Sequence, residues 1–279
     1  MRNVSQVYLT LVPLVTAILG FTVANVSYWV YGPLWVANLL LMLLSAWKLG
    51  GWAVTLASAE ARCWAASGLL LVAPWLFFSL FAGMGGPPAT PAAWVASAFE
   101  QQVRYCFLII GGILLLAGFV VLHEQLRLTR RNLFSSLGYA ALLVAIPLFV
   151  LNMSYWHSFM LQVFKLNQAA SRNTPDWLEP VKKLFLALAI IEVSLTYFAT
   201  AAFAAALQVA GWFSKRVARM YYTIGLLACL LVACYGLYPD GITTSGFPFY
   251  PFMIPAIPFA MPFYIGVNLL RRAGSAGLS

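Results

Sequence analysis

The sequence predicts an all-α protein that crosses a membrane several times, and three observations lead to this fold class. Of its 279 residues, 63% are hydrophobic and only 8% are charged, whereas soluble domains have about 25% charged residues. The apolar residues form eight segments, each near the ~20 helical residues that cross a bilayer. Most Lys and Arg residues lie between these segments. There are too few polar side chains to cover a water-soluble core of this size.

The eight segments predict eight transmembrane helices, because a strand edge in hydrocarbon would leave backbone groups unpaired. Their expected bounds are 7–30, 34–54, 63–84, 103–123, 134–157, 184–212, 220–239 and 248–270. The first segment is too long for the apolar part of a signal peptide, so we expect it to remain as a span. The Gly- and Pro-rich residues 85–91 are expected to form an exposed loop, and no soluble domain is expected.

The net charge of +9 is distributed unequally between the two sides of the predicted bundle. One side has Arg2, Arg62, Arg127, Arg130, Arg131, Lys215, Arg216, Arg219, Arg271 and Arg272. The opposite loops at 85–98 and 240–247 contain no Lys or Arg, although the loop between the fifth and sixth segments contains several. The positive-inside rule therefore predicts a multi-pass protein of the cell membrane with both termini in the cytoplasm. We attribute the basic charge to topology and anionic lipid, and expect no nucleic-acid partner.

Short motifs that occur twice in the same order predict an internal repeat. The motif Asn-x-Ser-Tyr-Trp begins at Asn25 and again at Asn152. The pair Gly-Trp occurs at Gly51 and again at Gly211. Four spans per copy is an even number, so both copies enter the membrane in the same direction. We therefore expect a parallel 4+4 repeat about an axis normal to the membrane.

The repeat also predicts how the chain is divided. We expect a first four-helix membrane unit at 1–130 and a second at 131–279. The second unit differs from the first by an outer insertion at about 158–182, whose residues 158–170 either continue the fifth span or lie flat at the interface.

Charged residues inside the predicted spans are rare enough to be candidates for function. Glu192 lies in the sixth segment, where a carboxylate either faces a polar cavity or stays protonated. The structural alternative is a neutral acid that hydrogen-bonds to a neighbouring group. Arg104 opens the fourth segment, and we expect it either to mark the outer boundary or to turn inward and pair with Glu192.

Three polar residues lie near the outer ends of the first and fifth spans. Asn25 and Asn152 occupy equivalent positions in the repeat. An amide that faces lipid is unfavourable, so both are expected to hydrogen-bond across helices or to line an outer cavity. His157 follows the second motif, and His123 lies at the opposite side of the membrane. The two histidines therefore cannot ligate one haem, and His157 is either an interfacial residue or part of an outer path.

The last segment has prolines at spacings of three and four residues, which would form one stripe along a helix. They are Pro248, Pro251, Pro255, Pro258 and Pro262. Each interior proline removes a backbone N–H and disturbs the carbonyl four residues earlier. The sequence predicts a bent last span, in which carbonyls near Pro255 and Pro258 bind a cation, line a hydrated path or are satisfied by neighbouring helices.

The sequence contains no motif typical of catalysis, a cofactor or a metal. The four cysteines lie in apolar segments without CxxC spacing, so neither a disulfide nor a zinc site is expected. No nucleophile–base pair, catalytic carboxylate pair or phosphate-binding Gly loop is recognisable. We expect no cofactor, and an enzyme that acts on a lipid is the least favoured class.

Two other classes of function fit the sequence. A permease or channel-like protein would move a small solute or ion through a site in the outer half, between the repeats. The residues along its path would be Glu192, Arg104, Asn25, Asn152, His157, Pro255 and Pro258. The alternative is a membrane-anchor subunit of a larger complex, in contact with a quinone or another lipid. A permease predicts a hydrated cavity that reaches Glu192, whereas an anchor predicts protein partners and an exposed apolar flank.

Overall fold

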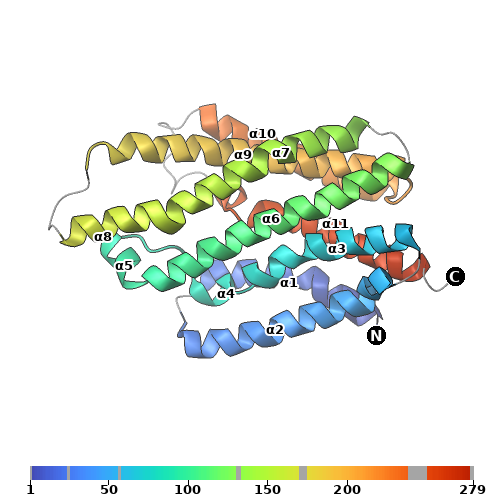
Figure 1. Ribbon diagram of the computed structural model, residues 1–279, viewed down its shortest axis with the longest axis horizontal. Helices are drawn as coiled ribbons and strands as arrows, with labels where there is room; N and C mark the ends of the chain where they lie inside the picture. Colours follow the sequence, from blue (N-terminus) through green and yellow to red (C-terminus); the bar gives the residue numbers. More distant parts are fainter. Residues whose placement is uncertain are drawn as a thin grey trace.

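The computed structural model describes residues 2–23, 26–55, 58–129, 133–169, 175–237 and 250–276. Every element in these ranges is helical (Figure 1), which confirms the all-α fold class for the described part of the chain. Seven of the described helices are long and apolar enough to cross a membrane. This finding supports the predicted multi-pass membrane protein.

The seven long helices follow the first seven predicted spans. They are α1 (Arg2–Thr22), α2 (Tyr28–Leu49), α3 (Ala59–Phe78), α6 (Ala98–Thr129), α7 (Leu133–Ser154), α9 (Leu178–Val209) and α10 (Lys215–Leu237). A 3₁₀ turn at Gly51–Thr55 precedes α3, and Ser58 caps that helix by accepting a hydrogen bond from the backbone N–H of Ala61. Two short helices, α4 (Phe81–Met84) and α5 (Pro91–Ala96), connect α3 to α6.

The fifth span continues beyond its predicted end. A π-helix at Tyr155–Met160 follows α7 directly and leads into α8 (Leu161–Ala169). The described first part of the predicted insertion is therefore an extension of α7, which is the first of the two alternatives that the sequence left open. Because α9 begins at Leu178, the insertion also ends within a helix.

The last predicted span differs from the expected bent helix. Its described residues form 3₁₀ turns at Tyr250–Met253 and Ile257–Phe259, and α11 extends only from Ala260 to Ala276. The reason is that Pro255 and Pro258 lack the N–H groups that an α-helix over these residues would need. We call residues 250–259 the broken segment. With 17 residues, α11 is not among the seven long helices.

Both ends of the described chain lie at one end of the bundle, which we call the terminal end (Figure 1). The Arg2 guanidinium donates to the carbonyl oxygen of Arg271 and, at 3.0 Å, to Oγ of Ser275. Arg272 donates to the carbonyl oxygen of Gly211 at 2.8 Å, so α11 returns the chain to the end where α9 stops. The helices α5 and α8 lie at the opposite end, which we call the loop end.

Most helices pack against the next long helix along the chain. Contacts join α3 to α6, α6 to α7, α7 to α9 and α9 to α10, and α6 and α7 run through the middle of the bundle in Figure 1. The exception is α11, which packs mainly against α3. A Cβ atom on Gly266 would lie 2.8 Å from the carbonyl oxygen of Gly68, so only a glycine allows these two backbones to approach so closely.

The two copies of the repeated motif differ in backbone conformation. Ser27 immediately precedes α2, whereas Ser154 ends α7 and is followed at once by the π-helix. In addition, α11 of the predicted second unit packs against α3 of the first. The parallel 4+4 repeat and the division into units 1–130 and 131–279 therefore stay predictions of the sequence.

Candidate functional site

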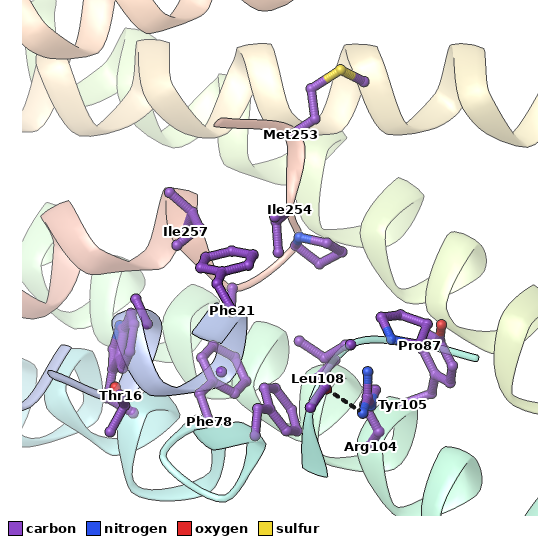
Figure 2. A pocket seen from close by; sticks show the side chains of 18 residues that line it. Thr16, Phe21, Phe78, Pro87, Arg104, Tyr105, Leu108, Met253, Ile254 and Ile257 are labelled. Atoms are coloured by element: carbon purple, nitrogen blue, oxygen red, sulfur yellow. Dashed lines mark hydrogen bonds between the residues drawn. The ribbon is translucent and has the colours of Figure 1, made fainter. Parts of the chain in front are cut away.

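A cavity of about 370 Å³ lies between α1, α3, α4, α6 and the broken segment. Most of its wall is aromatic or aliphatic, and Figure 2 shows these side chains around a common space. Phe21 comes from α1, Phe78 from α3, Leu108 from α6 and Ile254 from the broken segment. The size and lining are typical of a small-molecule site, in which a few polar groups orient the ligand.

Arg104, in the second turn of α6, is the charged residue of this lining, and only 6% of its surface is exposed. Its Nη2 donates hydrogen bonds to the carbonyl oxygens of Gly85, at 2.8 Å, and Met84, at 3.4 Å. The guanidinium carbon lies 5.9 Å from the centre of the Phe81 ring. The Nε–H of Arg104 has no hydrogen-bond partner among the described residues. The guanidinium is therefore held by backbone through Nη2, while its Nε–H is buried without an acceptor.

One of the two carbonyl groups belongs to Gly85, the first residue of the loop predicted to be exposed, and the other belongs to Met84, the last residue of the predicted third span. Met84 and Gly85 are in fact buried, whereas Gly86 and Pro87 are exposed. Gly85 has a φ of 63°, in the left-handed region that glycine adopts without steric cost. This turn places the Gly85 carbonyl against Arg104. The expectation of an exposed loop was wrong for Gly85, whose carbonyl turns inward to the cation on α6.

A second donor without a partner belongs to the same lining. Trp75 is 2% exposed, and its indole Nε1–H has no acceptor among the described residues. A buried N–H without an acceptor costs about 1–3 kcal/mol. The free groups of Arg104 and Trp75 are both donors and cannot accept. Two residues of the cavity lining therefore have buried donors whose hydrogen bonds are unmet among the described residues.

No carboxylate neutralises Arg104 by an ion pair in the described ranges. Ion pairs in these ranges include Glu124–Arg127 and Glu179–Lys182, both formed by solvent-accessible side chains. Glu100 lies one turn before Arg104 in α6, but no salt bridge joins the two. Because an unpaired buried charge is costly, an anion in the cavity would be stabilised by Arg104.

The ion pair predicted between Arg104 and Glu192 is wrong. The helices that bear them, α6 and α9, each pack against α7, and Arg104 faces the cavity instead. Glu192 accepts a 3.0 Å hydrogen bond from Nδ2 of Asn152 on α7. These two side chains are 1% and 3% exposed. The cross-helix hydrogen bond expected of Asn152 is therefore present, but its partner is the acid of α9.

The structure does not bring the described residues of the predicted path together at one site. Arg104 and Pro255 line the cavity, whereas Glu192, Asn152, His157 and Pro258 do not. Oε2 of Glu192 and Oδ1 of Asn152 have no partner among the described residues, so this pair forms a second buried polar region. His157 lies in the π-helix, where its Nδ1 is 2.6 Å from Oγ of Ser158. Pro258 is buried in a 3₁₀ turn, and Asn25 lies outside the described residues.

The aromatic walls of the cavity were missed by sequence reasoning. Phe21, Trp75 and Phe78 lie in apolar spans, where an aromatic residue is equally suited to lipid, a neighbouring helix or a cavity. Their sequence positions contain no signal that separates these three environments. Only the rotation of each helix against its neighbours places the three rings around one space.

In the described ranges, no group of three His, Cys, Asp or Glu side chains is placed to hold a metal ion. The chain matches no protein-family model, no curated protein and no solved structure. Its function is therefore argued from the cavity and the buried polar pair alone.

Proposed function

We propose that this protein is a multi-pass membrane permease that binds a small organic anion in the cavity beside Arg104. The observation that supports the proposal is a buried guanidinium, with no ion-pair partner in the described residues, that lines an otherwise apolar cavity. In surroundings of low dielectric constant, a cation attracts an anion far more strongly than it does in water. The planar guanidinium also fits carboxylate, sulfonate and phosphate groups.

The other walls favour an anion that has an apolar body. Phe21, Phe78 and Phe81 supply aromatic surface, which packs well against aromatic or aliphatic groups. An inorganic anion such as chloride would leave most of this apolar surface without contacts, so an organic anion fits better.

In the proposed orientation, the terminal end faces the cytoplasm and the cavity lies in the outer half of the cell membrane. Basic residues such as Arg62, Arg127 and Arg219 lie toward the terminal end, whereas residues 85–98 near the cavity contain no Lys or Arg. The broken segment and α11 would make the eighth crossing, since Arg272 returns to Gly211 at the terminal end. Both termini would then be cytoplasmic.

The pair of Glu192 and Asn152 would couple movement of the anion to a proton or a cation. Each residue has an acceptor oxygen without a partner among the described residues. Such oxygens can bind either a proton or a cation. The pair joins α7 to α9, and α7 also packs against α6, which bears Arg104. In the predicted repeat, the contact of α6 with α7 is the seam between the two units, where duplicated transporters place relative motion.

Uptake of labelled benzenesulfonate into proteoliposomes tests the proposal, since a sulfonate stays charged and does not cross lipid unaided. Arg104→Gln should lower uptake by roughly tenfold to a hundredfold, the loss expected for a charge-assisted hydrogen bond. Arg104→Lys should restore part of the activity, because lysine retains the charge but not the planar donor set. Arg127→Gln, at an exposed arginine of the same helix, is the matched control. Normal uptake by Arg104→Gln would exclude the cavity as the transport site.

The same vesicles test the coupling role. Glu192→Gln should abolish any dependence of uptake on a proton or sodium gradient, whereas equilibrium binding of benzenesulfonate should stay close to the wild-type value. A variant that retains gradient-driven uptake would show that Glu192 is structural only.

A membrane-anchor subunit that contacts a quinone is the second candidate. The helices α1 and α2 expose large apolar side chains along much of their length, including Leu14, Trp29 and Leu44, which suits a partner helix as well as lipid. Quinone carbonyl oxygens would accept hydrogen bonds from Arg104 and Trp75 in the same cavity. Binding of a short-chain quinone without binding of benzenesulfonate, together with co-purification of soluble subunits, would favour this function.

A further inference from the structure

The cavity reaches exposed residues at two places that differ in chemistry. Beside Arg104 its lining includes Gly86 and Pro87, which are exposed toward the loop end. Away from Arg104 its lining includes Phe21, which is 58% exposed on the apolar flank of the bundle. Figure 2 shows Pro87 next to Arg104, and Phe21 on the side of Ile254. We call the exposed border of the lining at Phe21, beside α1, the apolar mouth.

The apolar mouth is bordered by the weakly packed half of a helix. The buried residues of α1 lie between Ser5 and Pro13, and none follows Pro13. Beyond it, Leu14 and Ile18 are 53% and 61% exposed, while Thr16 and Gly20 line the cavity. Pro13 has no N–H, so a backbone hydrogen bond is missing where the buried half ends. Residues 14–22 are thus a thin wall between the cavity and the apolar surroundings of the bundle.

We propose that the ligand is a single-chain amphiphile with one acidic head, which enters the cavity from the outer leaflet past residues 14–22 of α1. This inference rests on the proposed function, because it assigns the substrate class of the same anion site. The acidic head binds Arg104 near the interface, and the chain lies along Phe21 and Ile254 toward the apolar mouth. An amphiphile in the outer leaflet already has this orientation, with its head at the interface and its chain in hydrocarbon.

The cavity volume limits the length of the bound chain. A volume of about 370 Å³ equals that of roughly twelve water molecules at ~30 Å³ each, which accommodates an acidic head and a chain of about eight carbons. A longer chain extends through the apolar mouth into the bilayer. The chosen probe is therefore octanesulfonate, whose head stays charged.

Equilibrium binding to the protein in nanodiscs, with empty nanodiscs subtracted, tests the ligand class. Octanesulfonate should bind roughly tenfold or more tightly than methanesulfonate, because each buried CH₂ group adds a favourable transfer free energy. Octanol, which has the chain without the charge, should bind weakly. Arg104→Gln should remove the preference for octanesulfonate over octanol. Equal affinities for octanesulfonate and methanesulfonate would overturn the amphiphile assignment, while uptake of benzenesulfonate would still test the anion site separately.

A reversible crosslink tests the route of entry. A Cβ atom on Gly20 would lie 3.9 Å from Cα of Ala82 in α4, a separation that permits a disulfide between Gly20→Cys and Ala82→Cys. The background is a variant without the four native cysteines. Oxidation should slow the association of octanesulfonate by about tenfold or more, as expected when a wall that must open is pinned, and reduction should restore it. Ala201→Cys with Gly225→Cys, which pins α9 to α10 at a Cβ separation of 3.1 Å, is the matched control.

Substitutions at the mouth test the same route without a crosslink. Phe21→Trp should slow the association of octanesulfonate, and Phe21→Ala should accelerate it, because the side chain borders the apolar opening. Association at an unchanged rate in both variants, or in the oxidised Gly20→Cys/Ala82→Cys protein, would overturn lateral entry. Uptake of benzenesulfonate that still depends on Arg104 would then show that only the route, and not the proposed function, has failed.

Discussion

Nδ2 of Asn152 in α7 donates a 3.0 Å hydrogen bond to Oε1 of Glu192 in α9, and both side chains are almost completely buried. Elsewhere the two helices pack closely, as where Gly138 of α7 meets Phe203 and Ala199 of α9. A polar pair in such surroundings fixes the register of the two helices, because sliding by one turn would separate donor from acceptor. Removing one member of the pair should therefore lower the free energy of unfolding more than the same change at an exposed position.

Asn152→Ala should destabilise the protein by about 1–3 kcal/mol, since it leaves the carboxyl group of Glu192 without its donor in a buried site. Unfolding by SDS in mixed micelles, followed by circular dichroism, measures the change. Glu192→Gln retains an oxygen that accepts from Asn152, so this variant should lose less unfolding free energy than Asn152→Ala. If Asn152→Ala is as stable as the wild type, the pair contributes nothing to holding α7 against α9.

Gly85→Ala should weaken both the loop and the anion site. Gly85 has a φ of 63°, and a side chain in this left-handed conformation costs about 1–2 kcal/mol. The strain would move the carbonyl that accepts from Arg104, so benzenesulfonate should bind more weakly in equilibrium measurements. Gly86→Ala is the control, because no heavy atom lies within 4 Å of a Cβ placed there. Equal affinities of the two variants for benzenesulfonate would contradict the turn described for Gly85.

Gly266→Ala should separate α11 from α3. The added Cβ would lie 2.8 Å from the carbonyl oxygen of Gly68, and overpacking of this kind costs about 1–3 kcal/mol. Thermal unfolding in detergent micelles measures the loss. Gly32→Ala in α2, where a Cβ meets nothing within 4 Å, should leave the unfolding temperature near the wild-type value. Two variants of equal stability would show that the α3–α11 contact is looser than described.

Labelling of single cysteines tests the orientation, in a background without the native cysteines. Pro87→Cys is exposed near the loop end, and Ser275→Cys lies near the terminal end. A membrane-impermeant maleimide should label Pro87→Cys in intact cells and Ser275→Cys only after lysis. The reverse pattern would place the termini outside. Labelling of both positions in intact cells would mean that the chain crosses the membrane an even number of times between them, which contradicts the five crossings proposed.

Most of the helical architecture could be predicted from the sequence. An apolar segment in hydrocarbon has to satisfy its backbone groups within itself, so α1, α7 and α10 follow from composition and length alone. The same reasoning failed for the broken segment. The spacing of Pro255 and Pro258 matches a helical stripe, but periodicity does not register that each proline removes a hydrogen-bond donor. Local chemistry therefore replaced the expected helix with 3₁₀ turns.

The sequence by itself determined that the chain suits a lipid membrane, that its spans are helical and that few charges lie within them. Each of these properties follows from the local composition of the chain. Only the tertiary structure decided that Arg104 meets the carbonyls of Met84 and Gly85, and that Glu192 meets Asn152. The partner of a side chain depends on the rotation of its helix and on the order of neighbouring helices. Both are set by many weak packing contacts over the whole bundle, to which no short stretch of sequence corresponds.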